Sequence, residues 1–259
     1  MFIDTHAHLC DPAFDPDRSE VIARARAAGA AGIVCVGESL EDARKNLALA
    51  EQDPLLLPAA GQYPDRLDFV EAEALIELIR SESSKLVALG EVGLDRWITK
   101  KVHESEQAQL EQRQRELFLR FVDLALELDL PLNVHSRSAG RQTIAVLLER
   151  GARRVQMHAF DGKASTARPA VEAGYFFSVP PSIIRSRQKQ KLVGHLPLDC
   201  LLVESDSPVL GPEAGKRNEP ANVTAALRAI AEIKGLPEEQ VAEVVTGNTV
   251  RLYRPGGGA

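Results

Sequence analysis

The segment MFIDTHAHLCD, residues 1–11, starts with a short apolar stretch and then places His6 and His8 on either side of a single alanine. The whole chain contains only six histidines. FIDTH (2–6) has the apolar character of a buried β-strand. Because side chains alternate along a strand, Asp4, His6 and His8 project to the same side. The pair therefore suits a metal site at the end of a strand, although the pair alone fits structural histidines equally well.

Seven further apolar runs resemble this first strand. They are short and rich in valine, isoleucine and leucine, without the clean polar alternation of a half-exposed sheet, and this is typical of strands buried on both faces. The eight predicted strands are FIDTH (2–6), GIVCVG (32–37), LLLPAA (55–60), KLVALGE (85–91), LPLNVHS (130–136), RVQMHA (154–159), YFFSV (175–179) and CLLVESD (200–206).

Amphipathic helical patterns lie between these runs. Asp15-Pro16 and Gly29 mark the two ends of the first predicted helix, and Ser39 is the expected N-cap of the second. The predicted helices cover 15–29, 39–52, 67–82, 103–129, 139–150, 164–173, 184–194, 220–234 and 237–252.

Alternating strands and helices predict an α/β fold, a closed parallel (β/α)8 TIM barrel. An open doubly wound sheet is the structural alternative, but the chain has neither a GxGxxG fingerprint nor a phosphate-binding P-loop to support it. No linker or shift in composition divides the sequence. We therefore expect one hydrolase barrel over residues 1–253 and a disordered tail over residues 254–259.

Composition limits the function classes. The chain has 259 residues, a net charge of −6 and an isoelectric point near 5.6, so it lacks a long-range positive field that would attract nucleic acid. Three widely spaced cysteines suggest no disulfide framework and favour a reducing compartment. There is no signal-peptide pattern and no apolar run of membrane-spanning length. These features predict a cytoplasmic protein, with the nucleus left open, and no membrane or obligate protein partner.

The ends of the predicted strands carry the unusual residues. In a parallel barrel all carboxyl ends of the strands meet at one face, where active sites lie. Five of the eight strands end in groups that can bind metal, namely His6 with His8, Glu91, His135, His158 and Asp206. Four imidazoles and two carboxylates exceed the ligands of one four-coordinate ion and suit two ions bridged by a carboxylate. Imidazole favours Zn²⁺ or Mn²⁺ over Mg²⁺, and the pattern predicts metal-assisted hydrolysis.

At this point the chain resembles the TatD family of metal-dependent deoxyribonucleases, in the amidohydrolase-like branch of TIM barrels. The matching motifs run the length of the chain in the order of the family: FIDTHAHL (2–9), ALGEVGLD (88–95), LPLNVHSR (130–137), MHAFDG (157–162), LLVESDSP (201–208), GKRNEP (215–220) and TGNTVRLY (246–253).

This resemblance implies two or three divalent metal ions, with Zn²⁺ or Mn²⁺ favoured and Mg²⁺ as an alternative, and hydrolysis of DNA phosphodiesters as a 3′–5′ exonuclease or a related phosphodiesterase. Carried over by motif, the metal ligands are His6, His8, Glu91, His135, His158 and Asp206. Glu91 is then the expected bridge and Asp206 the expected base or water-orienting group. These two are the predicted catalytic residues.

One position departs from the family pattern. Family members commonly have Gly-x-His-Pro after the third strand, whereas this chain has GQYP (61–64), with Tyr63 in place of the histidine. A phenol can donate a hydrogen bond to a phosphate or water, but it is a poor base near neutral pH. The replacement therefore bears on substrate range and rate.

Several residues beside the predicted ligands are candidates for substrate binding or for orienting the ligands. Arg137 can fork onto a phosphate or pair with Asp95 or Glu204. We expect Glu204 to orient a ligand histidine, with binding of a third ion as the alternative, and Asp95 to orient a ligand or Arg137. Asp4 shares the inward side of the first strand. Asn218 lies in the loop after the eighth strand and is expected to tie that loop to the rim.

Three other features are open to two interpretations. Lys216 and Arg217 offer positive charge to a nucleic-acid backbone, with structural capping before Pro220 as the alternative. The run RSRQKQK (185–191) is favoured as a solvated helix face, with DNA contact as the alternative. Trp97, the only tryptophan, lies in a predicted loop where packing is favoured over base stacking.

Three functions compete on this site. The first is a TatD-type nuclease acting on DNA ends or single strands. The second is another hydrolase on the same metals, either a small-molecule phosphodiesterase or phosphatase, or a deacylase for D-aminoacyl-tRNA. The third is a non-catalytic metal-binding scaffold, which a complete set of ligands disfavours.

Overall fold

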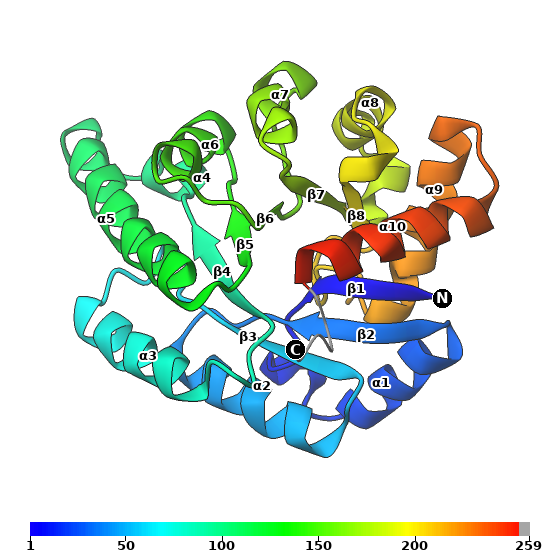
Figure 1. The fold of residues 1–259 in the computed structure, drawn as a ribbon, viewed down its shortest axis with the longest axis horizontal. Coiled ribbons are helices and arrows are strands. Elements are labelled where there is room, and N and C mark those ends of the chain that lie inside the picture. Colours follow the sequence, from blue (N-terminus) through cyan, green and yellow to red (C-terminus); the bar gives the residue numbers. More distant parts are fainter. Residues whose placement is uncertain (254–259) are drawn as a thin grey trace.

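Eight parallel strands form one sheet, and their order around the sheet is their order along the chain (Figure 1). The computed structural model describes residues 1–253, so the predicted tail at 254–259 lies outside the described residues. The strands are β1 (Phe2–Ala7), β2 (Ala30–Cys35), β3 (Leu56–Ala60), β4 (Ala88–Gly93), β5 (Leu132–His135), β6 (Val155–Met157), β7 (Phe176–Val179) and β8 (Leu201–Val203).

The sheet closes on itself between its first and last strands. A parallel bridge joins Ala7 to Ser207 just beyond β8. The amide of His8 donates to the carbonyl of Ser207 at 2.8 Å, and the amide of Asp206 donates to the carbonyl of His6 at 2.8 Å. Closure removes both sheet edges and sets the end of β1 beside the end of β8. The predicted (β/α)8 barrel is thereby confirmed, as a single domain.

Helices surround the strands and cover their outer face (Figure 1). The α-helices are α1 (Arg18–Ala27), α2 (Leu40–Gln52), α3 (Phe69–Glu82), α4 (Arg96–Thr99), α5 (Glu104–Leu128), α6 (Gly140–Glu149), α7 (Ala164–Glu172), α8 (Arg187–His195), α9 (Val223–Lys234) and α10 (Glu238–Tyr253). Short 3₁₀ turns are η1 (Pro12–Phe14), η2 (Pro181–Arg185), η3 (Leu198–Cys200) and η4 (Pro220–Asn222).

Two helix starts illustrate the local rules. Ser39 caps α2 as predicted, because its hydroxyl accepts from the amide of Asp42 at 3.1 Å. The first helix begins later than Asp15-Pro16 predicts, at Arg18, and Asp15 instead pairs with Arg18 and Lys45. The segment after β4, predicted to be a loop around Trp97, contains the one-turn helix α4, whose first turn is capped by Asp95.

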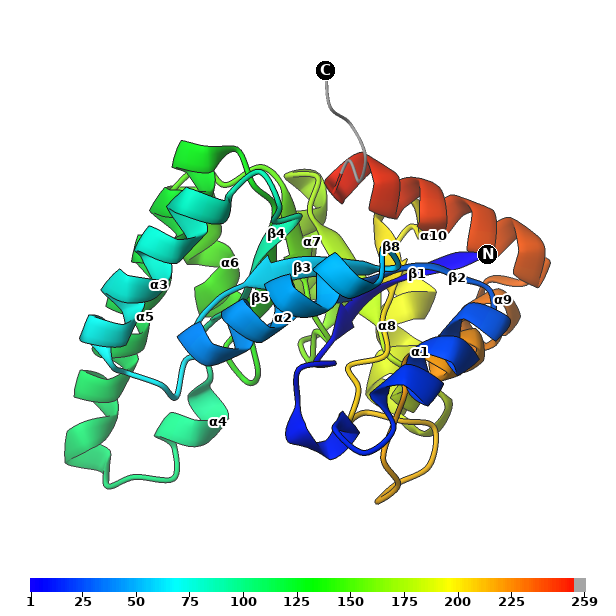
Figure 2. The same ribbon diagram turned by 90° about the horizontal axis from the view of Figure 1, so that it is seen from below.

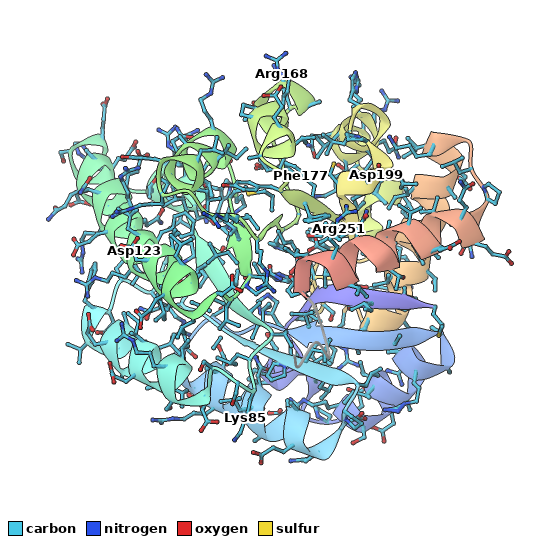
Figure 3. All side chains as sticks on the ribbon, in the orientation of Figure 1. Lys85, Asp123, Arg168, Phe177, Asp199 and Arg251 are labelled. Atoms are coloured by element: carbon cyan, nitrogen blue, oxygen red, sulfur yellow. The ribbon has the colours of Figure 1, made fainter. Side chains whose placement is uncertain are left out.

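The barrel interior divides into an apolar half and a polar half. Strand alternation points Val34, Ala59, Ala88 and Leu202 inward, and they form one buried cluster with Leu252 and Tyr253 from the end of α10. Helix α10 thus closes one end of the barrel, and α4 lies at the opposite end (Figure 2). Charged side chains such as Asp123 and Arg168 project outward from the helices (Figure 3).

At Gly93 the backbones of β4 and β5 approach each other closely. Gly93 at the end of β4 pairs with His135 at the end of β5, and a Cβ at this position would overlap the carbonyl oxygen of His135. Only glycine fits there. None of the helices in residues 1–253 combines the length and the apolar character that a membrane crossing requires.

Candidate metal centre

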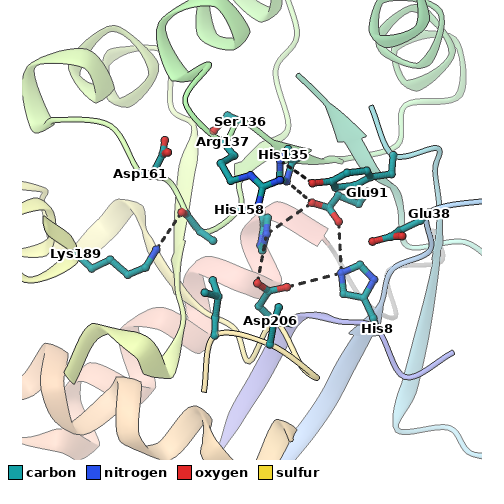
Figure 4. A pocket seen from close by; sticks show the side chains of 14 residues that line it. His8, Glu38, Glu91, His135, Ser136, Arg137, His158, Asp161, Lys189 and Asp206 are labelled. Atoms are coloured by element: carbon teal, nitrogen blue, oxygen red, sulfur yellow. Dashed lines mark hydrogen bonds and ion pairs between the residues drawn. The ribbon is translucent and has the colours of Figure 1, made fainter. Parts of the chain in front are cut away.

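A cavity of about 390 Å³ opens where the carboxyl ends of the strands meet. Its wall includes five of the six residues predicted as ligands, which are His8, Glu91, His135, His158 and Asp206 (Figure 4). The sixth, His6, is fully buried, with its ring edge-on to His8 and stacked on His158. Strand-end positions therefore bring all six side chains to one place, as their spacing predicts.

Two histidines and one carboxylate form the tightest group of donor atoms. His6 Nε2 lies 3.1 Å from His8 Nε2 and 3.5 Å from Asp206 Oδ1, and His8 Nε2 lies 3.7 Å from the same oxygen. Ligands at about 2.0–2.2 Å from a shared ion lie within roughly 4.4 Å of one another. The three atoms have the spacing that a shared ion requires.

Glu91 lies at the middle of the centre. Its Oε2 is 3.4 Å from His8 Nε2 and 3.8 Å from His6 Nε2, and its Oε1 is 2.6 Å from His135 Nδ1 and 3.7 Å from His158 Nε2. Each oxygen of one carboxylate thus faces two different imidazoles. This is the placement that a carboxylate bridging two ions requires.

Buried partners fix which nitrogen two of these rings present. The side-chain oxygen of Asn133 accepts from His6 Nδ1 at 2.8 Å, while its amide nitrogen donates to the carbonyl of Thr5. Glu204 accepts from His158 Nδ1 at 2.8 Å and from the amide of Ala159 at 2.9 Å. In both rings Nε2 is left to face the centre, which is the arrangement of ligand histidines held by a neighbouring acceptor.

His135 is placed differently from the other histidines. Its Nδ1 faces Glu91, and its Nε2 lies 3.0 Å from Asp95 Oδ2 and 3.2 Å from the hydroxyl of Tyr63. Within residues 1–253, three groups of at least three side chains could hold an ion, and His135 belongs to none of them. The structure therefore brings His135 next to Glu91 but pairs both of its nitrogens with carboxylates.

Asp95 accepts hydrogen bonds from Arg137 and Tyr63, whose roles the sequence leaves open. Arg137 donates to Asp95 Oδ2 through Nε at 2.9 Å, and its Nη2 forms an ion pair with the same oxygen at 2.7 Å. The pair with Asp95 therefore forms, and the pair with Glu204 does not. The phenol of Tyr63 donates to the same oxygen at 3.0 Å. Arg137 also stacks 4.1 Å from the centre of the Trp97 ring, which is 47% exposed.

Two predicted residues act at the closure of the barrel. Asp4 accepts from the amides of Ser205 at 2.8 Å and His6 at 3.2 Å, which ties β1 to the segment after β8. Burial raises the pKa of Asp4 to about 8, even though Ser205 donates to it. Asn218 donates to the carbonyls of Ser205 and Val209 at 2.7 and 2.8 Å and so holds the loop after β8, as expected.

Burial and mutual charge shift the proton affinities at the centre. Burial lowers the pKa of His6 well below its usual value. Burial opposes charge on His8 and His135, but nearby carboxylates, Glu91 above all, outweigh it and raise the pKa of each ring to about 9. Burial also opposes the charge of Glu91, yet His135 and His8 hold its pKa well below the usual range. Carboxylate charge is thus balanced by imidazole protons, which a divalent cation can displace.

Sequence reasoning missed one carboxylate of the site. Glu38, just beyond the end of β2, lines the cavity and forms a third group of donors with His8 and Glu91, all within 4.8 Å. The sequence contains a signal for it. Gly37-Glu38 lies at the end of the second predicted strand, just as Gly90-Glu91 lies at the end of the fourth. Burial raises the pKa of Glu38, and the positive charge of His8 opposes this.

Positive charges predicted near the rim are mostly paired elsewhere. Lys216 pairs with Glu213, and Arg217 forms hydrogen-bonded ion pairs with Asp17 at 2.6 and 2.8 Å. Both therefore pair within the protein, and no side chain of the described residues caps the turn that begins at Pro220. His103 and His195, which the strand-end pattern leaves out, lie at the start of α5 and the end of α8.

The donor set fits divalent metal ions. The three groups are His6–His8–Asp206, His6–Glu91–His158 and His8–Glu38–Glu91, with the donor atoms of each within 4.8 Å. Mixed imidazole and carboxylate donors suit Zn²⁺, Mn²⁺ or Fe²⁺. The groups share His6, His8 and Glu91 and therefore form one continuous cluster of donors.

Replacing Tyr63 by phenylalanine is expected to lower the free energy of unfolding by about 1.5 kcal/mol, since one hydrogen bond to a carboxylate is lost. Activity should fall by no more than about tenfold, because Asp95 keeps its bonds to His135, Arg137 and the amide of Ile98.

Urea denaturation measures the change in stability of the Tyr63→Phe variant, and kcat/KM measures its change in activity. Tyr175→Phe, which removes a bond to Ala152 away from the site, is the control. A loss above 100-fold would mean that the phenol takes part in the chemistry.

Comparison with known proteins agrees with this architecture. A family model described as TatD related DNase matches residues 3–254. A human protein named deoxyribonuclease TATDN3 is 42% identical over 97% of this chain and 94% of its own length. The uncharacterized metal-dependent hydrolase YabD of Bacillus subtilis is 34% identical over 98% of this chain and 99% of its own.

A solved structure supports the same relationship. The crystal structure of YjjV, a TatD homologue from Escherichia coli, superimposes with a TM-score of 0.88 at 29% identity, covering 98% of both chains. The family model spans almost the whole chain, and the relatives match it from end to end. This chain belongs to the TatD-related DNase family.

Proposed function

We propose that this protein hydrolyses phosphodiester bonds of DNA, working from 3′ ends, with two divalent metal ions held at the barrel mouth. The observation that carries the proposal is the position of Glu91, whose two oxygens each face two imidazoles at 2.6–3.8 Å. Proteins named as deoxyribonucleases among the relatives support DNA as the substrate.

The proposed ligands are the six strand-end residues, with Glu91 as the bridge: His6, His8, Glu91, His135, His158 and Asp206. When bound, the ions would stabilise charge on the phosphoryl group and lower the pKa of water toward 7. Zn²⁺ or Mn²⁺ is proposed over Mg²⁺ because most of the donors are imidazoles. For His135 to serve as a ligand, one of its ring nitrogens must exchange its contact with Glu91 or Asp95 for a bond to the ion.

Asp206 is proposed to orient the attacking water and accept its proton. Support comes from its position: Oδ1 faces His6 and His8, and Oδ2 lies 3.9 Å from His158 Nε2 at the cavity wall. Asn133 and Glu204 keep His6 and His158 in fixed tautomers while this occurs. Burial around these groups limits water near the reacting atoms and strengthens their electrostatic interactions.

Cavity size supports action at a chain end. A volume of about 390 Å³ is near the lower limit of small-molecule sites, roughly 300–1,000 Å³. A strand end or a single nucleotide unit suits such a space better than the middle of a duplex. The same observation favours one second candidate, a phosphodiesterase acting on small molecules.

The test compares substrates on the metal-reconstituted protein. We expect kcat/KM for a single-stranded oligonucleotide labelled at its 5′ end to exceed that for bis(p-nitrophenyl) phosphate and for a D-aminoacyl-tRNA. Products should shorten one nucleotide at a time from the 3′ end, as seen on a sequencing gel. A higher kcat/KM for the small diester would favour the second candidate, and internal cuts would reject the exonuclease mode.

Removing metal is expected to lower the melting temperature. A ligand that binds only the folded state at 100 times its Kd adds about 2.7 kcal/mol of stability, which is about 5–10 °C for a domain of this size. Calorimetry of chelator-treated protein, before and after Zn²⁺ or Mn²⁺ is returned, measures the shift. Equal melting temperatures in the two states would contradict a structural role for the ions.

A further inference from the structure

Only two lysine or arginine side chains line the cavity among residues 1–253, and they differ in their partners. Arg137 is bound to Asp95 through two nitrogens, so its charge is balanced within the protein. Lys189, from α8, forms no ion pair with any described residue within 4.0 Å. The cation that an incoming anion can use most directly is therefore Lys189.

Lys189 is held against the metal centre rather than on the outer face of its helix. Its ammonium group donates to the carbonyl of Ala159 at 3.1 Å, and Ala159 directly follows His158 (Figure 4). A lysine ammonium has three N–H donors, and the carbonyl of Ala159 is its one acceptor among residues 1–253. Two donors thus remain for a ligand in the cavity.

Neighbouring charges act on Lys189 from a distance, and none of those within residues 1–253 forms a close ion pair with its ammonium group. Asp161, Glu204 and Asp206 attract the Lys189 ammonium from a distance, and Arg185 repels it. Burial outweighs these attractions and lowers the pKa of Lys189, as expected of a cation short of close partners. Its neighbours Arg187 and Lys191 on the same helix are exposed, so the solvated helix face predicted for RSRQKQK applies to them and not to Lys189.

We propose that Lys189 binds a non-bridging oxygen of the phosphoryl group that is hydrolysed at the carboxylate–histidine centre. This inference rests on the proposed function in that the substrate is a phosphoester. Lys189 thereby selects for a phosphoryl group over a neutral carboxylic ester, which has no anionic oxygen to offer. Arg137, engaged with Asp95, serves mainly to position that carboxylate and through it His135.

The experiment measures binding of inorganic phosphate to the metal-reconstituted full chain by isothermal titration calorimetry. The variants are Lys189→Met, Lys189→Arg and the matched control Lys191→Met, which removes the same charge from an exposed position of the same helix. Metal content by elemental analysis and circular dichroism accompany each titration. Values of kcat/KM for bis(p-nitrophenyl) phosphate and for a single-stranded oligonucleotide complete the set.

We expect Lys189→Met to weaken phosphate binding by about 10- to 100-fold, the range of one hydrogen bond to a charged group. Lys189→Arg should recover most of the affinity, and Lys191→Met should match the wild type. Both phosphodiesters should lose kcat/KM to a similar extent in Lys189→Met. Metal content should stay unchanged in all variants.

Three results would overturn the inference. They are wild-type phosphate affinity in Lys189→Met, an equal loss in Lys191→Met, and a loss of kcat/KM confined to the oligonucleotide, which would place Lys189 on a flanking phosphate. The outcome is separable from the proposed function. If the wild type binds phosphate through Lys189 but leaves DNA intact, the inference is supported and DNA is rejected as the substrate. If the protein cleaves DNA but binds phosphate independently of Lys189, DNA is supported as the substrate and the inference is rejected.

Discussion

Replacing Glu91 by glutamine is expected to lower kcat/KM by at least about 1,000-fold. Glu91 is 2% exposed and faces His6, His8, His135 and His158, so its charge is the one that all four imidazoles share. A neutral amide in that place removes the proposed bridge. Transition-state stabilisation by the ions is worth several kcal/mol, and each 1.4 kcal/mol is a factor of ten.

The measurements for this variant separate chemistry from folding. Steady-state kinetics give kcat/KM, elemental analysis gives bound metal, and circular dichroism with thermal melting reports the fold. Metal content should fall together with activity. Glu213→Gln makes the same chemical change at an exposed loop position and should behave as the wild type. A Glu91→Gln variant with full metal and full activity would falsify the proposed centre.

Replacing Asp206 by asparagine is expected to lower kcat by about 100- to 10,000-fold, the usual contribution of a positioned general base. Asparagine keeps an oxygen near His6 and His8 but cannot take a proton from water. KM should therefore change by only a few-fold, and a large part of the bound metal should remain.

The split between kcat and KM decides the role of Asp206. A rise in KM at constant kcat would assign it to substrate binding instead of proton transfer. Complete loss of metal would make it a ligand first. Asp123→Asn, on the outer face of α5, is the matched control and should leave both parameters unchanged (Figure 3).

Fold and strand ends could be predicted from local sequence because each depends on nearest neighbours in the chain. Apolar runs alternating with amphipathic helices predicted eight strands, and the sheet contains all eight in chain order. The positions of His6, Glu91 and His158 followed from where their strands end. Glu38 was missed although the same rule applied to it, because a single carboxylate after a strand is also typical of a solvated loop.

Side-chain partners could not be predicted in the same way. Arg137 had two possible carboxylate partners in the sequence, and the structure selects Asp95. His135 was predicted as a ligand like the other histidines, yet both its nitrogens face carboxylates. Lys189 lies in a run of basic residues whose other members are largely exposed, and only the turn of α8 toward Ala159 sets it apart.

By itself the sequence determined the barrel, the face on which the site lies and the chemistry of its donors. These depend on strand periodicity, helix boundaries and residue type, all of which are local. Tertiary structure decided which donor meets which, because closure between β1 and β8 and the register of β4 with β5 bring together atoms from distant parts of the chain. Distances of 3–4 Å between such atoms depend on the packing of the whole barrel, which no local pattern contains.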